Sequence, residues 1–198
     1  MRSVLLFVED FGHEEVLRAV ISRLAHQYDI EVTISARSAT GGHGRVLREL
    51  EQYTGLMQQQ PDRIPDLLVV ATDANCNKYA TRKKAIDDKL PASVKDLTVC
   101  AIPEPHIERW LLIDSVAFKA VLGQGCAPPP AKCERDLYKR LLIEAIRDAG
   151  LTPLVGGIEH ARDIVNRMDF GSVERTDKSF GRFLIEIQRK FKEWRRPG

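Results

Sequence analysis

Two continuous apolar runs, each ending at polar or acidic residues, constrain the fold of this chain most strongly. Val4–Val8 runs directly into Glu9, and Leu67–Ala71 runs into Thr72 and Asp73. A strand that is apolar on both faces must be covered by helices on both sides, which is typical of the parallel sheets of α/β proteins. The two runs therefore predict an α/β fold built on an open sheet.

The rest of the chain supplies further strands, at 30–36 and 97–102, and helices, at 14–28, 45–60 and 78–89. This alternation predicts a mainly parallel four-stranded sheet flanked by helices. Beyond Pro103 the spacing of apolar residues is helical, with expected helices at 107–113, 116–122, 135–149, 158–168 and 179–194. We therefore predict an α/β core over 1–122 and a helical extension over 123–198, packed together as one compact unit. The first part of this extension, 123–132, is a linker-like segment with three consecutive prolines.

The overall charge and the spacing of cysteines and histidines give little support to several classes of function. The 30 basic and 28 acidic residues give a net charge of only +2, so any nucleic-acid partner must be argued from local charge. The cysteines form no C-x-x-C pair and the five histidines are scattered, which gives no support to a zinc ribbon or a redox motif. We expect reduced thiols in a cytoplasmic protein. The N-terminal apolar run is too short for a signal sequence or a membrane span.

Acidic residues follow three of the expected strands. Glu9 follows the first, Asp73 the third and Glu104 the fourth, with Glu108 about one helical turn further on. Ligands of open α/β sheets bind outside the carboxyl ends of the strands, so these carboxylates are expected to converge. Such hard oxygen donors favour Mg²⁺ or Mn²⁺ and metal-assisted phosphoryl chemistry. The alternative is that these acids merely cap the following helices.

Four sequence segments carry a family resemblance. The first, VEDFGHE at 8–14, has Glu9 and Glu14 five residues apart after a strand. The second, ATDAN at 71–75, has an asparagine where an aspartate-x-aspartate motif has its second aspartate. The third, IPEPHIERWL at 102–111, places Glu108 in a glutamate-x-tryptophan-leucine signature, and the fourth comprises 131–132 with 168–184. In this order they resemble the small Toprim-like proteins related to the overcoming-lysogenisation-defect nucleases.

The resemblance implies a Toprim-like fold and a metal-dependent nuclease that hydrolyses phosphodiester bonds of DNA or RNA. It also implies a separately encoded companion ATPase, as in phage-defence systems, and it is compatible with a homo-oligomer. The departures from the pattern at Asp10 and Asn75 leave an alternative, a catalytically weak Toprim-like binding subunit of an ATPase or nucleic-acid complex. The implied site residues are the catalytic ligands Glu9, Asp73 and Glu108, the further ligands Glu14, Asn75 and Glu104, and Lys132 or Lys178 for charge on the phosphate.

Two groups of basic residues are candidates for contacts with a phosphate backbone. The first group follows the Asp73 motif and is our preferred surface because it lies near the expected site in sequence. The second lies near the C-terminus, where Phe191 and Trp194 are interleaved at a spacing that also fits a packing stripe. The members of the two groups are Lys78, Arg82, Lys83 and Lys84, and Lys190, Lys192, Arg195 and Arg196.

Overall fold

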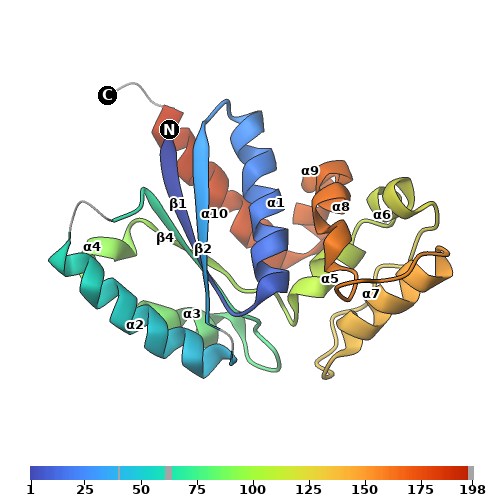
Figure 1. The fold of residues 1–198 in the computed structure, drawn as a ribbon, viewed down its shortest axis with the longest axis horizontal. Helices are drawn as coiled ribbons and strands as arrows, with labels where there is room; N and C mark the ends of the chain where they lie inside the picture. The colour runs from blue at the N-terminus through green and yellow to red at the C-terminus, as the bar shows by residue number, and fades with distance from the viewer. Residues whose placement is uncertain (40, 61–63, 196–198) are drawn as a thin grey trace.

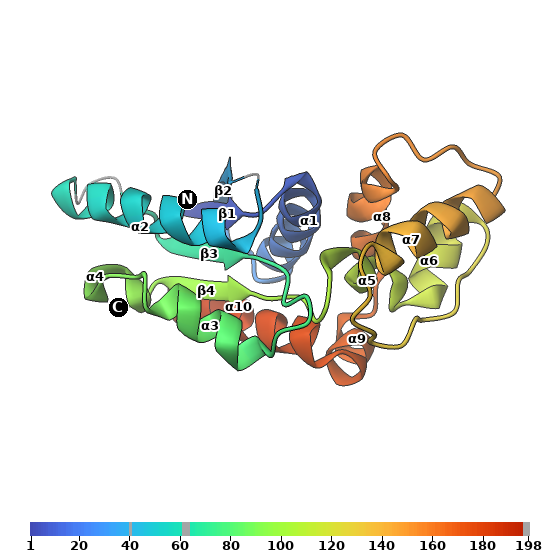
Figure 2. The same cartoon turned by 90° about the horizontal axis from the view of Figure 1, so that it is seen from below.

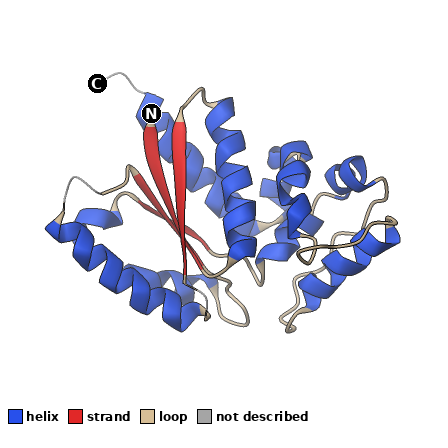
Figure 3. Ribbon diagram, viewed as in Figure 1, coloured by secondary structure: helices blue, strands red, loops and turns tan. Residues whose placement is uncertain are grey.

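The computed structural model describes residues 1–39, 41–60 and 64–195. It confirms an α/β fold with one four-stranded sheet between helices (Figure 1; Figure 3). In chain order the elements are β1 (Arg2–Val8), α1 (Phe11–Gln27), β2 (Val32–Ser38), α2 (His43–Gln59), β3 (Leu67–Ala71), α3 (Tyr79–Asp87), α4 (Ala92–Lys95), β4 (Thr98–Ala101), α5 (Ile107–Leu112), α6 (Ser115–Leu122), α7 (Leu137–Asp148), the short 3₁₀ helix η2 (Ile158–His160), α8 (Ala161–Arg167), α9 (Phe170–Thr176) and α10 (Lys178–Arg195).

The four strands are parallel and lie in the order β2-β1-β3-β4. Val8 pairs with Ala71, and Ala71 pairs with Ala101, so β1, β3 and β4 end level with one another. The residues that follow these strands therefore leave the sheet at the same edge, and this edge carries the acidic site.

Both faces of the sheet are buried, as the apolar runs predict. On β1, Leu6 and Val8 pack into a core layer with α1 and α10, whereas Leu5 and Phe7 pack into a second layer with α2 and α3. Figure 1 shows α2 and α3 on one side of the sheet and α1 and α10 on the other. The edge strand β2 alternates between half-buried and exposed residues, in agreement with its alternating sequence.

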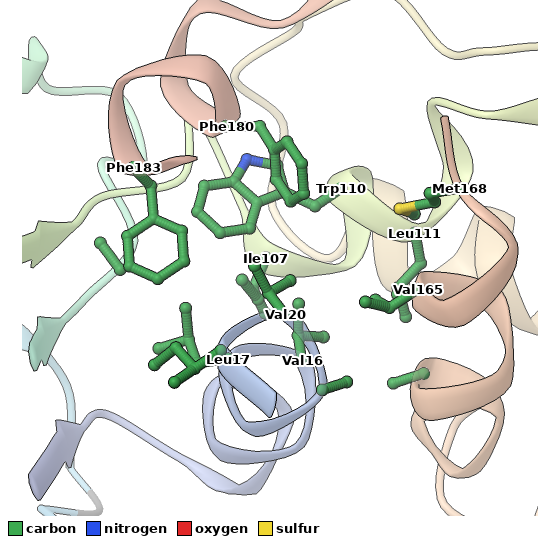
Figure 4. Packing of buried hydrophobic residues seen from close by; sticks show 14 of the residues in the cluster. Val16, Leu17, Val20, Ile107, Trp110, Leu111, Val165, Met168, Phe180 and Phe183 are labelled. Atoms are coloured by element: carbon green, nitrogen blue, oxygen red, sulfur yellow. The ribbon is translucent and has the colours of Figure 1, made fainter. Parts of the chain in front are cut away.

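The helices α5 to α9 gather beyond the end toward which β3 and β4 point (Figure 2). Trp110 of α5 is fully buried, and its ring centroid lies 4.8 Å from that of Phe180 at the start of α10 (Figure 4). Its indole N–H donates to the Ser179 hydroxyl at 2.9 Å. Because α10 also covers one sheet face, the C-terminal helices and the sheet share one hydrophobic core. The sequence pattern missed α4 and α9.

The cysteines differ from the expectation of four reduced thiols. Cys76 and Cys133 form a disulfide with Cα atoms 5.3 Å apart, whereas Cys100 and Cys126 are free. The expectation is wrong for this pair because spacing rules detect only cysteines that are close in sequence, and the fold brings these two together across 57 residues.

Among the helices of the described residues, we find none with both the length and the apolar character that crossing a membrane requires.

Candidate acidic site at the carboxyl end of the sheet

The site is assembled from the ends of two neighbouring strands and the starts of two helices. Glu9 follows β1, and Asp73 lies two residues beyond β3. Asp10 caps α1, because its carboxylate accepts a hydrogen bond from the backbone N–H of His13 at 3.0 Å. On the other side of Asp73, α5 begins at Ile107.

Asp73 is the centre of a hydrogen-bonded network that also contains Asp10, His13 and His106, here called the Asp73 network. Oδ1 of Asp73 lies 3.1 Å from Nε2 of His13 and accepts the backbone N–H of Ile107 at 2.9 Å. Oδ2 lies 2.9 Å from Nδ1 of His106. Both carboxylate oxygens of Asp73 are thus engaged by donors from α1 and from the start of α5.

His13 lies between two carboxylates in the core of this network. Its Nδ1 is 2.8 Å from Asp10, its Nε2 faces Asp73, and its side chain is fully buried. Burial lowers the pKa of His13, but the charge of Asp73 and the hydrogen bonds to Asp10 and Asp73 outweigh it and raise the pKa well above 6.5. His13 is therefore an imidazolium that donates from both ring nitrogens.

The same contacts act on the two carboxyl groups. Burial raises the pKa of Asp73, yet the charge of His13 and the hydrogen bond from His106 leave it below its usual value. For Asp10, burial is likewise outweighed by the hydrogen bond and charge of His13, which lower the pKa to about 2. His106 has a raised pKa because of its hydrogen bond to Asp73. The network therefore joins the carboxylates of Asp10 and Asp73 to the rings of His13 and His106.

Glu108 lies on α5 beside this network. Burial raises its pKa, and the negative charge of Asp73 raises it further, while the nearby charge of His13 opposes the shift. A carboxyl group in such a position gains from any additional cation, because a cation offsets both the burial and the repulsion.

Glu9 is oriented from the other side of Asp73 by a second chain of hydrogen bonds. The hydroxyl of the buried residue Thr72 donates to Oε2 of Glu9 at 2.6 Å, and the backbone N–H of Asp73 approaches the same oxygen at 3.4 Å. Nδ1 of His43, the first residue of α2, lies 3.2 Å from the Thr72 hydroxyl oxygen. Burial and the charge of Arg82 lower the pKa of His43 to about 4, so the neutral ring donates to Thr72 through Nδ1–H.

The three further expected ligands, Glu14, Glu104 and Asn75, make contacts with residues outside the Asp73 network. Glu14 pairs with Arg18 of α1 at 2.7 Å. Glu104 pairs with Arg182 of α10 at 2.7 Å and accepts the backbone N–H of Tyr79 at 3.4 Å, so it caps α3.

Asn75, the third of them, has a backbone φ of 51° and donates its backbone N–H to Pro105 at 3.0 Å. The alternative that these acids cap the helices directly after them does not describe these contacts, because Glu104 accepts from the start of α3, which precedes it, and Asp73 accepts from the start of α5.

Three residues of the preferred basic group, Arg82, Lys83 and Lys84, make two kinds of contact. Lys83 and Lys84 form ion pairs with Asp87 and Asp88, one turn further along α3. Arg82 instead donates to the backbone carbonyl of Ala74, in the turn that follows Asp73.

Three other lysines expected to contact phosphate, Lys78, Lys132 and Lys178, are exposed. Lys78 precedes α3, Lys132 lies in the segment before α7, and Lys178 begins α10. In the C-terminal group, Phe191 is buried and stacks on Trp194 with ring centroids 5.2 Å apart. These two rings therefore pack against the protein core. Arg196 lies outside the described residues.

Sequence reasoning missed the residues that organise the site. None of the contacts made by Thr72, His43, Asp10, His13 and His106 was predicted from the sequence. One local signal was available, since an aspartate just before a segment with helical apolar spacing is a typical N-cap. The contacts of His43 and Thr72 with Glu9 join residues distant in sequence, and no local pattern predicts them.

The donor types at the site fit a hard cation, but their arrangement does not yet form a ligand shell. Glu9, Asp73 and Glu108 offer carboxylate oxygens, which are the donors that Mg²⁺ and Mn²⁺ prefer. Within residues 1–39, 41–60 and 64–195, however, no three side chains of His, Cys, Asp or Glu are arranged so that they could hold a metal ion. In this arrangement the rings of His13 and His106 contact both carboxylate oxygens of Asp73.

Comparison with known protein families, with curated proteins and with solved structures finds no match to this chain.

Proposed function

We propose that this protein is a metal-dependent nuclease of the Toprim type, a hydrolase of phosphodiester bonds in DNA or RNA. One observation carries the proposal: Glu9 and Asp73 leave neighbouring parallel strands at the same edge, and Glu108 lies near Asp73, whose negative charge raises the pKa of Glu108 beyond the effect of burial. Carboxylates brought together in this way favour the binding of a divalent cation.

In this proposal Glu9, Asp73 and Glu108 hold Mg²⁺ or Mn²⁺. The bound metal supplies positive charge for the phosphate oxygens and for the attacking water. The protein's own residues bind and orient the substrate. Thr72 fixes the direction of the Glu9 carboxylate through the 2.6 Å hydrogen bond. Arg82, which lies against the turn after Asp73, and the exposed Lys132 are placed to attract phosphate groups.

A second candidate is a catalytically weak binding subunit that docks on an ATPase or a nucleic acid. The observation that favours it is that His13, His106 and the backbone N–H of Ile107 contact both carboxylate oxygens of Asp73. The negative charge of Asp73 is thus stabilised by residues of the protein without a metal ion. A subunit of this kind requires no metal.

The proposed setting follows from the resemblance described for the sequence. It is cytoplasmic, with a companion ATPase from a phage-defence system as partner, and a homo-oligomer is compatible with it.

The first experiment separates the two candidates. The purified protein is titrated with Mg²⁺ and Mn²⁺ by calorimetry and is then incubated with labelled single-stranded and duplex DNA and RNA. Glu9→Gln and Asp73→Asn are expected to abolish both metal binding and cleavage. Asp88→Asn, which changes an exposed acid of α3, is the matched control and is expected to keep both.

Saturable metal binding with cleavage supports the nuclease. Nucleic-acid binding without metal binding supports the binding subunit instead. Full cleavage by a purified Asp73→Asn protein shows that the acidic site does not carry the activity.

A further inference from the structure

The disulfide lies directly beside two residues of the proposed site. Cys76 follows Asn75 in the turn between β3 and α3, and Cys133 follows Lys132 in the segment before α7. The turn after Asp73 is therefore covalently joined to the segment that carries Lys132.

A second contact holds the same segment from inside the protein. The hydroxyl of the buried residue Tyr138 accepts the backbone N–H of Lys132 at 2.6 Å and lies 2.8 Å from the carbonyl oxygen of Pro130. The ring centroid of Tyr138 lies 5.9 Å from that of His106, which in turn bonds to Asp73. The segment 130–133 is thus attached at two points, through the disulfide to the turn after Asp73 and through the Tyr138 hydroxyl to α7.

The attached segment is suited to contact an anionic substrate. Lys132 is an exposed cation within it, and the charged residues that follow form ion pairs, Glu134 with Arg140 at 2.7 Å and Arg135 with Asp136 at 3.5 Å. Holding the Lys132 cation beside a site that acts on phosphodiesters increases the attraction of that site for a phosphate backbone. The disulfide orders this segment without contributing any ligand to the acidic site.

Both cysteines are exposed, so a thiol in solution can reach the bridge. In a cytoplasm, disulfides are uncommon and are usually transient or redox-sensing. A bridge that is accessible, joins two loops and adjoins the site therefore has the position expected of a regulatory bond and not of a purely structural one.

We propose that Cys76–Cys133 is a thiol-sensitive clasp that regulates nucleic-acid binding by holding the segment 130–136 beside the acidic site. The inference rests on the proposed nuclease function. With the bridge closed, Lys132 stays beside the site. With the bridge open, the segment keeps only its contacts with Tyr138 and Arg140 of α7, and the turn that contains Asn75 and Cys76 is released from it.

The reductant that opens the clasp is a small dithiol, which supplies two electrons. Its thiolate attacks one sulfur of the bridge and forms a mixed disulfide, while the other cysteine leaves as a thiolate and takes up a proton. The second thiol of the reductant then displaces the remaining cysteine and becomes part of a disulfide within the reductant. Cys76 and Cys133 end as thiols, and the reductant ends oxidised.

The test compares the oxidised full-length protein, the same protein after treatment with a dithiol, and the variants Cys76→Ser and Cys133→Ser. Cys126→Ser, which removes a free thiol, is the matched control. Thiol titration establishes the state of the bridge, because the oxidised protein has two free thiols, Cys100 and Cys126, and the reduced protein has four. Affinity is measured for a fluorescent single-stranded DNA, with Ca²⁺ in place of Mg²⁺ to suppress cleavage, and hydrogen exchange is followed over residues 130–136.

Opening the bridge is expected to weaken DNA binding about three- to tenfold, as loss of the phosphate contact of Lys132 would. Exchange over 130–136 is expected to become faster, while Mg²⁺ affinity stays the same because Glu9, Asp73 and Glu108 do not belong to the clasp. The control variant is expected to match the oxidised wild type in DNA affinity, hydrogen exchange and Mg²⁺ affinity, and to show one free thiol, Cys100, in place of two.

Several outcomes would overturn the clasp. Four titratable thiols in protein purified under air show that the bridge does not form. Equal DNA affinity in the oxidised and reduced forms shows that it does not regulate binding. If no form binds DNA or RNA, the proposed function fails on that result, and the clasp is judged by hydrogen exchange alone: faster exchange on reduction supports it, and equal exchange refutes it.

Discussion

Nε2 of His13 lies 3.1 Å from Oδ1 of Asp73 across a separation of 60 residues, and the His13 ring is fully buried. The contact joins the first turn of α1 to the residues that follow β3, and the same carboxylate reaches the start of α5 through His106 and Ile107. A single carboxylate thus links three elements, which makes Asp73 a structural residue as well as a candidate metal ligand.

This linkage predicts that Asp73→Ala lowers the free energy of unfolding by about 2 to 4 kcal/mol, because it leaves the buried cation of His13 with one partner fewer. Considered only as one of several mutually repelling acids, Asp73 would be removable without loss of stability. Urea unfolding distinguishes the two expectations. Asp88→Asn serves as the control, since its ion pair with Lys84 is exposed. An unfolding midpoint unchanged in Asp73→Ala contradicts the network.

The histidines predict a loss of stability at alkaline pH. The folded-state pKa values of His13 and His106 are raised above 6.5, so the folded protein retains these protons to a higher pH than the unfolded chain does. Their contribution is complete below about pH 6.5 and is lost as the pH rises through the folded-state values, with a slope of up to about 1.4 kcal/mol per pH unit for each group. Urea unfolding between pH 6 and pH 9 measures this slope, and His13→Gln is expected to reduce it. A flat profile for the wild type would rule out a stabilising imidazolium.

Much of the fold is predictable from local pattern, because a strand buried on both faces leaves a continuous apolar run. Val4–Val8 and Leu67–Ala71 both form central strands, and the acids after them meet at one edge because parallel strands share a direction. The start of α1 is less well predicted. The helix begins at Phe11 and not at Glu14, since the cap at Asp10 adds a turn that the apolar spacing does not record.

The interior of the site is much less predictable. Whether His13 is a polar loop residue or a buried cation depends on Asp73, which comes from another part of the chain. The bond between Cys76 and Cys133 depends in the same way on packing and not on spacing. Long-range contacts of this kind are set by the whole fold, so the sequence predicts which residue types gather at the sheet edge but not how they pair.

Thr72 gives a test of how Glu9 is positioned. Thr72→Val keeps the shape of the buried side chain but removes the hydroxyl that donates to Glu9 and accepts from His43. We expect metal affinity to fall about five- to tenfold, which corresponds to roughly 1 kcal/mol for one hydrogen bond. Thr72→Ser retains the hydroxyl and is expected to bind metal as the wild type does. Calorimetric titration with Mn²⁺ compares the three proteins, and equal affinity for the valine variant would show that Glu9 needs no such support.

Substitutions of Asn75 test the effect of having an asparagine where the aspartate-x-aspartate motif has its second aspartate. Its φ of 51° lies in the left-handed region, which asparagine, aspartate and glycine tolerate better than other residues. Asn75→Ala is therefore expected to cost about 1 kcal/mol of stability, whereas Asn75→Asp should leave the unfolding free energy nearly unchanged. The backbone conformation accommodates an aspartate, so a change of charge can be tested without a change of fold.

On the proposed function, an amide at position 75 brings no negative charge, and the number of charged ligands is a main determinant of affinity at sites for hard cations. We expect the native protein to bind Mn²⁺ better than Mg²⁺, because Mn²⁺ generally binds nitrogen and oxygen ligands more tightly. Asn75→Asp is expected to tighten the binding of either ion by about 1 to 2 kcal/mol, the order of one charge–charge contact after the cost of desolvation. Calorimetric titration of the parent and the variant with both ions measures this difference, and Asn77→Asp, two residues further along the same turn, controls for added charge alone. If Asn75→Asp binds metal no better than Asn77→Asp does, then residue 75 does not face the ion and the resemblance to an aspartate-x-aspartate motif is misleading at this position.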